Sequence, residues 1–249
     1  MARRIAITGF KGGSGRSTVA ANLASVLASR GHKTLLVDMD PQAQAGRCLG
    51  VEKEGQVGTY ELLLGLETNA AKVALPTAVS GLHLIPSSLR LCGAEQELAS
   101  IPRRAHRLGQ ALSRLEEGYF FVLVDCPAYF GLLTLNALAA CHEAWTPVAG
   151  AMDARSLEDF SRITAAVAEE LGSCATLTGI VPNMWEKKTP GLSTGALEKK
   201  YGKRLIRSKI RMDAKLREAA AAGKPVNLFA PESGAAFDFE ALADDLMAL

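Results

Sequence analysis

A glycine-rich stretch near the start of the chain, GFKGGSGRST at residues 9–18, has the composition of a phosphate-binding loop. Such loops commonly follow the pattern G-x-x-x-x-G-K-[ST], in which backbone N–H groups, a lysine and a hydroxyl surround the phosphates. This chain departs from the pattern at two positions, because Phe10 replaces the first glycine and Arg16 replaces the lysine. An additional lysine, Lys11, precedes the glycines. The stretch could be a nucleotide site, an altered nucleotide site or only a flexible turn.

The surroundings of this stretch favour a phosphate site over a flexible turn. The apolar run RIAIT predicts a strand before it, and the pattern of residues 17–31 predicts a helix after it. A loop in that position can aim converging backbone N–H groups and a helix dipole at phosphate oxygens. Gly12, Gly13 and Gly15 would allow this approach, and Ser17 places a hydroxyl where Mg²⁺ would be coordinated.

Three aspartates end predicted strands and could hold a metal or orient a water. Asp38 and Asp40 follow the apolar run TLLV, and Asp125 follows FFVLV. In an open parallel sheet, ligands bind at the carboxyl ends of the strands. A single aspartate in such a place is often only a helix cap. Three of them beside a phosphate loop instead predict a Mg²⁺ site and a catalytic carboxylate.

The fold expected to position these residues is an α/β fold, with a mostly parallel, doubly wound sheet flanked by helices. Short apolar runs alternate with longer helical patterns along the chain, as in such folds. Strands are predicted at 4–8, 33–38, 82–86, 119–125, 143–148 and 176–182. Helices are predicted at about 17–31, 94–116, 132–140, 155–171, 191–201, 213–222 and 234–248. Without a repeat or a linker, residues 1–249 are predicted to form one domain.

The composition argues against several other classes of protein. The five cysteines include no C-x-x-C pair, which argues against a zinc or iron–sulfur site and favours reduced thiols. No apolar run is long enough to span a bilayer. The N-terminal segment MARRIAITGF predicts a first strand rather than a secretion signal. The expected location is therefore cytoplasmic.

Several segments together resemble the ParA/MinD family of ATPases with a deviant phosphate loop (P-loop), and above all its ParA (Soj-like) DNA-partition branch. The segments are KGGSGRST, LLVDMDPQAQA, TYELLLG, LCGAEQEL, VLVDCPAYFGLLTLNAL and AAAGKPV. They cover nearly the whole chain and are specific in combination. The resemblance implies a P-loop NTPase fold, ATP and Mg²⁺ as cofactors, and a homodimer that forms with ATP.

The resemblance also implies roles for individual residues. Lys11 would reach across the dimer to the phosphates of the second subunit, as an arginine finger does in trans. Ser17 and Asp125 would hold Mg²⁺, Asp38 would support the metal shell, and Asp40 would orient the attacking water. The residues implied to bind ATP are Lys11, Gly12, Gly13, Ser14, Gly15, Arg16, Ser17, Thr18 and Asn183.

The match with the family is least simple at three positions, Thr18, Asn183 and Arg16. By the resemblance, Thr18 would contact the α-phosphate and Asn183 would lie near the base, where an amide can satisfy the N6/N7 edge of adenine. Asn183 is equally well explained as a turn residue after a strand. Arg16 departs from the family lysine, since a guanidinium is bulkier, planar and more demanding in geometry. As a catalytic residue it is predicted to preserve ATP binding while slowing hydrolysis, or to weaken both.

Basic residues are concentrated from Glu186 to Arg217, where eleven basic residues oppose three acidic ones. The rest of the chain has more acidic than basic residues, so the formal net charge is only +2. A basic face suits salt-sensitive, sequence-independent contacts with DNA phosphates, although an ordinary solvated face has the same composition. By the resemblance, Lys188 and Lys215 match positions where partition ATPases often carry DNA-contacting arginines. The predicted DNA-binding residues are Lys187, Lys188, Lys199, Lys200, Lys203, Arg204, Arg207, Lys215 and Arg217.

The leading hypothesis is an ATP-switched dimer that binds DNA without sequence preference, associates with the nucleoid and positions a plasmid, chromosome or other cargo with a ParB-like activator. A MinD-like membrane positioner is disfavoured because the end of the chain, FDFEALADDLMAL, carries acids that would oppose an anionic bilayer. No membrane partner is therefore predicted. An iron protein of the nitrogenase type would need cluster cysteines that have no counterparts here. A degenerate adaptor with little hydrolysis remains open because of Arg16.

Overall fold

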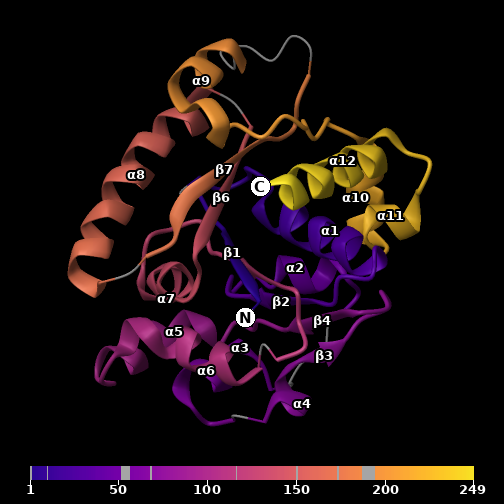
Figure 1. The fold of residues 1–249 in the computed structure, drawn as a ribbon. Coiled ribbons are helices and arrows are strands. Elements are labelled where there is room, and N and C mark those ends of the chain that lie inside the picture. Colours follow the sequence, from indigo (N-terminus) through magenta and orange to yellow (C-terminus); the bar gives the residue numbers. More distant parts are fainter. Residues whose placement is uncertain are drawn as a thin grey trace.

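A seven-stranded sheet forms the centre of the protein, seen in a computed structural model (Figure 1). The structure describes residues 2–9, 11–51, 57–67, 69–115, 117–149, 151–172, 174–186 and 194–249. The strand order is β3-β4-β2-β5-β1-β6-β7, and all neighbours are parallel except β3, which runs antiparallel to β4. The strands are β1 Arg3–Ile7, β2 Thr34–Asp38, β3 Leu75–Pro76, β4 Leu82–Ile85, β5 Phe121–Asp125, β6 Glu143–Val148 and β7 Thr176–Pro182.

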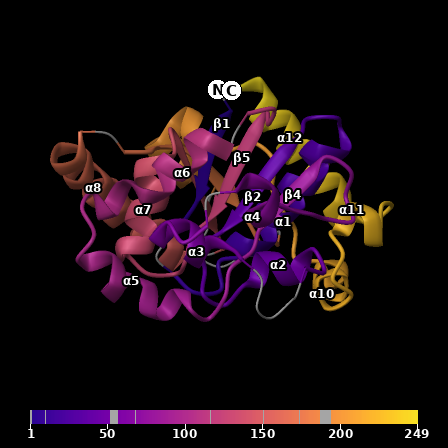
Figure 2. The same cartoon turned by 90° about the horizontal axis from the view of Figure 1, so that it is seen from below.

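Helices cover both faces of the sheet, as the two views show (Figures 1 and 2). Those on one face are α5 Leu91–Ala99, α6 Arg107–Leu115, α7 Leu132–Ala140 and α8 Ala151–Leu171. Those on the other are α1 Arg16–Ser29, α2 Gln44–Cys48, α10 Ala214–Ala221, α11 Val226–Phe229 and α12 Gly234–Ala248. The remaining helices are α3 Thr59–Leu64, α4 Ala70–Val73, α9 Thr194–Tyr201 and two short 3₁₀ turns, η1 Arg104–His106 and η2 Gly202–Arg204.

The alternation of side chains along the strands produces a hydrophobic core on each face. On β5, Val122 and Val124 lie in the core under α5 to α8, whereas Phe121 and Leu123 lie in the core under α1 and α12. Both faces of the central strands are buried, which explains why these strands read as continuous apolar runs. The predicted α/β fold with a mostly parallel sheet is confirmed.

One predicted helix is wrong. The sequence pattern predicts a single helix over about 94–116, but the chain forms α5, then η1 and α6. Pro102 interrupts the pattern, and Arg103 adopts a left-handed conformation at φ 55° that no helix can include. The sequence also gives no prediction for α2, α3, α4, β3 or α11, which are too short for a periodic pattern to develop.

Two expectations from composition can be compared with the described residues. All five cysteines are free thiols; Cys48, Cys126 and Cys141 are buried, whereas Cys92 is exposed. Within the ranges given above, no helix combines the length and apolar character that crossing a membrane requires.

Candidate nucleotide site

The three central strands bring the phosphate loop and two aspartates to one edge of the sheet. β5 lies between β1 and β2, and Asp125 is in register with Ile7 on one side and with Asp38 on the other. The chain leaves Ile7 and passes through the loop into α1. The loop, Asp38 and Asp125 therefore meet at the carboxyl edge, where parallel sheets bind ligands.

The glycine loop leaves open space on its outer side and packs closely on its inner side. A Cβ atom added at Gly12 would meet no described atom within 4 Å. At Gly15 the backbone is left-handed at φ 84°, and a Cβ atom would lie 2.3 Å from Nδ2 of Asn183. Gly15 is thus required by packing, whereas Gly12 borders the open space in which a phosphate can approach backbone N–H groups.

Asn183 holds this loop from the end of β7. Its Nδ2 donates a hydrogen bond to the Ser14 carbonyl oxygen at 2.7 Å, and the side chain is buried. The family resemblance implies a contact with adenine here, and the sequence pattern fits a turn residue, but neither predicts this bond. One amide hydrogen is therefore already committed to the loop, and the adenine contact stays a prediction.

Arg16 is buried beneath the loop rather than extended from it. Its Nη1 donates to the carbonyl oxygens of Gly9 at 3.0 Å and Lys11 at 2.6 Å, and to Oγ of Ser14 at 3.3 Å. Its Nε donates to the Cys126 carbonyl oxygen at 3.1 Å. Arg16 is 7% exposed, so the charge that replaces the usual lysine lies inside the loop.

The other loop residues lie at the front of the loop and in the first turn of α1. Lys11 is exposed at the front of the loop. Ser17 and Thr18 lie in the first turn of α1, whose N-terminal N–H groups have no partner within the helix. The Thr18 carbonyl oxygen accepts a hydrogen bond from Asn22 at 2.8 Å, which stabilises this turn.

Asp125 is a buried carboxylate without hydrogen bonds. It is fully buried, and neither of its oxygens has a hydrogen-bond partner among the described residues. Burial raises the pKa of Asp125 to about 7. The Ser17 hydroxyl, which is near the carboxylate but outside hydrogen-bond geometry, and the charge of Arg16 oppose this rise. Burying an ionised carboxylate destabilises the folded protein unless a cation or a proton compensates its charge.

Asp38 is also buried, but its oxygens are engaged. They accept hydrogen bonds from the backbone N–H groups of Asp40 and Gly46, each at 3.1 Å. Burial, together with the charge of Asp125, raises the pKa of Asp38 well above its ordinary value. Asp40 accepts a hydrogen bond from the Gln42 backbone N–H at 2.9 Å. It is partly exposed and therefore closer to solvent than Asp38.

Two hydroxyl groups that the sequence does not single out fix this acidic turn. Thr59 Oγ1 donates to the Asp38 carbonyl oxygen at 2.7 Å, and Ser87 Oγ donates to the Asp40 carbonyl oxygen at 2.5 Å. Thr59 is the first residue of the segment TYELLLG, and its place in that segment was the only available signal. The pairing of β2 with β4 is what brings Ser87 close to the turn.

These residues fit Mg²⁺ together with a phosphate chain. Within the described ranges, no group of three or more acidic, histidine or cysteine side chains could hold a metal alone. Mg²⁺ usually takes only one or two carboxylates from the protein and completes its shell with water and substrate phosphates. The unpartnered Asp125 and the Ser17 hydroxyl, beside an open glycine cradle, match that requirement.

The basic residues on the helices of the segment 186–217 form two separate groups. Lys199, Lys200, Lys203 and Arg204 lie on α9 and η2, whereas Lys215 and Arg217 lie on α10. In Figure 1, α9 lies beside α8, while α10 lies beyond α12 near α2. Lys187 and Lys188 fall outside the described residues. The segment therefore does not form one helix face.

Ion pairs divide these residues further. Lys200 pairs with Glu158, and Lys215 pairs with Glu218 at 2.6 Å. Five other predicted DNA-binding residues are exposed and form no ion pair with any described residue. These residues are Lys199, Lys203, Arg204, Arg207 and Arg217.

Comparison with known proteins agrees with this geometry. A protein family described as "AAA domain" matches residues 2–171. The chain is 34% identical to sporulation initiation inhibitor protein Soj from Bacillus subtilis, covering 100% of this chain and 99% of that protein. It is 37% identical to the chromosome-partitioning ATPase Soj from Thermus thermophilus, with 99% and 96% of the chains covered.

A solved structure agrees as well. The septum site-determining protein MinD from Pyrococcus horikoshii, complexed with Mg-ADP, is 26% identical with a TM-score of 0.82, covering 99% of this chain and 96% of that one. The similarity thus extends along the whole chain. The chain belongs to the ParA/MinD family of P-loop ATPases, with Soj and ParA among its relatives.

Proposed function

We propose that this chain binds ATP with Mg²⁺, forms an ATP-dependent dimer, binds DNA without sequence preference and drives segregation or positioning of a cargo. The observation that carries the proposal is the unpartnered, buried Asp125 carboxylate beside the open space at Gly12. A bound cation would compensate the charge of Asp125, and a bound phosphate would occupy the open space beside Gly12. The relatives named Soj and the MinD complex with Mg-ADP support the same function for this chain.

In this proposal the loop residues bind the phosphates. The backbone N–H groups from Gly12 to Ser17 converge on the phosphate oxygens, and the N-terminus of α1 adds its dipole. Asp125 and Ser17 hold the cation, while Asp38 fixes the turn that carries Asp40. Bound Mg²⁺ would neutralise charge on the transferring phosphoryl group.

Hydrolysis in this proposal depends on two residues outside the glycines. Asp40 is partly exposed two residues beyond the sheet edge and orients the attacking water. Lys11, exposed at the front of the loop, reaches the phosphates of the second subunit, which makes ATP part of the dimer interface. The dimer in turn doubles any surface that binds DNA.

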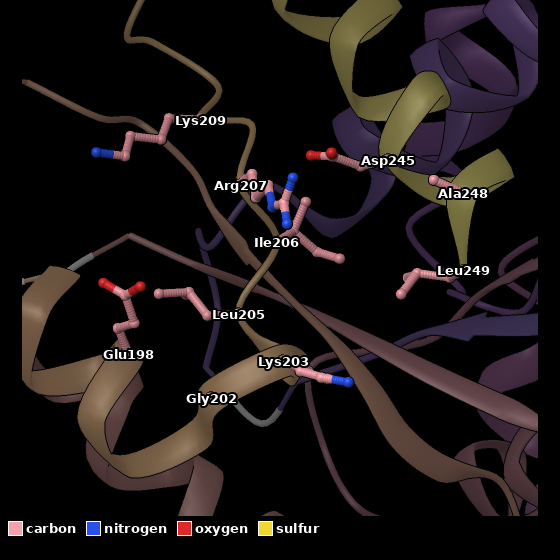
Figure 3. Close-up of a pocket in the computed structure, with 10 residues that line it drawn as sticks. All are labelled: Glu198, Gly202, Lys203, Leu205, Ile206, Arg207, Lys209, Asp245, Ala248 and Leu249. Carbon is pink, nitrogen blue, oxygen red and sulfur yellow. The ribbon is translucent and has the colours of Figure 1, made fainter.

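The exposed cations near η2 are the part of the basic segment that we assign to DNA phosphates. Lys203, Arg207 and Lys209 line a groove of about 840 Å³ between η2, the extended segment 205–209 and the end of α12 (Figure 3). Glu198 and Asp245 line the same groove. Their negative charge would repel a phosphate inside it, so we place the DNA backbone on the exposed rim.

The test of DNA binding is a salt series on duplex DNA with and without ATP and Mg²⁺. Charge reversal at Lys203 or Arg207 should weaken binding equally for all sequences, and each lost phosphate contact should lower the salt slope by about 1. Arg114→Glu, an exposed arginine on α6, is the control and should have no effect. Tight binding of the nucleotide-free protein to one sequence would contradict the proposal.

The wider setting follows from the same function. A DNA-bound ATP dimer would associate with the nucleoid in the cytoplasm, and a ParB-like activator would stimulate hydrolysis and release the DNA. We propose no membrane partner. A reading frame for such an activator beside this gene would support DNA partition over other kinds of positioning.

A second candidate function is favoured by the position of Arg16. Because its guanidinium is bonded to the loop, the chain could be an adaptor that binds nucleotide with little hydrolysis. Calorimetry and phosphate release together distinguish the cases, since an ATPase binds and hydrolyses ATP, the adaptor binds ATP without turnover and a fully degenerate site binds no ATP.

A further inference from the structure

Arg16 connects three parts of the site through one side chain. Its guanidinium donates to the first part of the loop at Gly9 and Lys11, to the Ser14 hydroxyl, and to Cys126, the residue that follows Asp125. Gly9 and Lys11 lie before the glycine cradle, and Cys126 lies at the end of β5. The loop is therefore tied to the strand that carries the proposed metal ligand.

These bonds occupy most of the donors of the side chain. A guanidinium has five N–H donors in a fixed fork, and the bonds described here use those of Nε and Nη1. Nη2 makes no hydrogen bond with any described residue and is the group left for an incoming phosphate. A lysine has three donors on a single nitrogen, so it cannot reproduce this fork.

We propose that Arg16 is a positioning residue that fixes the shape of the phosphate loop before nucleotide binds. Arg16 holds the backbone at Lys11, the residue that reaches the second subunit in the proposed dimer. The role of Arg16 in nucleotide binding rests on the proposed function, whereas the ordering of the loop by Arg16 does not. Burial makes the bonds significant, because removing the guanidinium leaves the carbonyl groups of Gly9, Lys11 and Cys126 without this donor.

The test is backbone ¹⁵N relaxation on the full chain without nucleotide. In the parent protein the amides of Gly12 and Gly13 should have order parameters near the rigid value of about 0.85, and Arg16→Gln should lower them below about 0.6. Arg16→Lys should give an intermediate value because it keeps some donors. This second variant preserves the test if the glutamine variant does not fold.

A matched control is available in Arg4, another buried arginine. It donates to the Ala140 carbonyl oxygen at 3.2 Å and to Ser113 Oγ at 3.3 Å, away from the phosphate loop. Arg4→Lys should reduce the melting temperature and leave the order parameters of Gly12 and Gly13 unchanged. A parallel fall in this control would show that the loop responds to stability in general and would overturn the proposal.

The remaining outcomes separate this inference from the proposed function. Equal order parameters in the parent and in both Arg16 variants would overturn the positioning role, whatever the protein binds. If the parent loop is ordered and depends on Arg16 but no ATP binds in calorimetry, the proposed function fails and the positioning role stands.

Discussion

Asn183 and Ser14 are 169 residues apart in sequence, yet the Asn183 amide donates to the Ser14 carbonyl oxygen at 2.7 Å. The bond joins the end of β7 to the phosphate loop that follows β1, across β6. Gly15 permits this contact because any side chain there would collide with the amide. The loop is therefore held by Asn183 from the end of β7 and by Arg16 from beneath it.

Replacing Asn183 by alanine tests what this amide does. If it orders the loop, affinity for ATP and for inorganic tripolyphosphate should fall by the same factor, up to about tenfold for one lost buried hydrogen bond. Titration calorimetry with both ligands measures this. A loss confined to ATP would instead support the contact with adenine that the family resemblance implies.

Lys11→Ala and Gly12→Val should each prevent dimerisation by ATP and Mg²⁺. The first removes the charge that reaches the second subunit, and the second fills the open space beside the phosphates. Light scattering with and without nucleotide measures the mass, and Lys224→Ala, an exposed lysine outside the site, is the control. A parent protein with the same mass in both conditions would exclude the nucleotide-dependent dimer.

Asp40→Ala should leave ATP binding largely intact and lower the turnover number by at least about a hundredfold, as expected for loss of the group that orients the water. The dimer should then persist after ATP is added. Turnover by phosphate release and lifetime by light scattering are the two measurements. Unchanged turnover would mean that Asp40, which also bonds to Gln42, only stabilises its turn.

Arg16→Lys should raise the turnover number, on the order of tenfold, and change ATP affinity only modestly. A lysine is free to approach the transferring phosphoryl group, where small errors of position are costly. The backbone contacts that bind ATP remain in the variant. If the lysine variant hydrolyses ATP no faster, arginine is a tolerated equivalent at this position and slow hydrolysis has another cause.

The unliganded protein should lose stability as pH rises towards neutrality because of Asp125. Burial raises its pKa to about 7 in the folded state, so this carboxyl favours folding below its unfolded pKa of about 3.9. That contribution is lost as pH rises through about 7, with a slope of at most about 1.4 kcal/mol per pH unit. Asp38, whose pKa is also raised, acts in the same direction.

Urea unfolding of the parent and of Asp125→Asn at pH 5 and pH 7.5 measures this effect. The asparagine variant should gain stability relative to the parent as pH rises, because its amide does not ionise. The experiment is done without nucleotide or Mg²⁺, since a bound cation would reverse the effect. An equal difference at the two pH values would show that Asp125 is not the titrating group.

The sequence alone determined the class of fold and indicated a phosphate site at the glycine stretch. Long apolar strands, such as the one before Asp125, could be predicted because burial on both faces leaves an uninterrupted apolar run. The position of the glycine stretch between a strand and a helix was enough to indicate a phosphate loop. These signals are local, and so they can be read without knowing how the strands pair.

Only the tertiary structure decided how the site residues are used. Strand order placed Asp38 and Asp125 in register and left one carboxylate bonded and the other without partners. The break between α5 and α6 depended on a left-handed residue that no periodic pattern marks. The orientation of Arg16 depended on carbonyl groups that follow the ends of two different strands, β1 and β5. Contacts between distant segments set the directions of these side chains, and a sequence pattern carries no information about such directions.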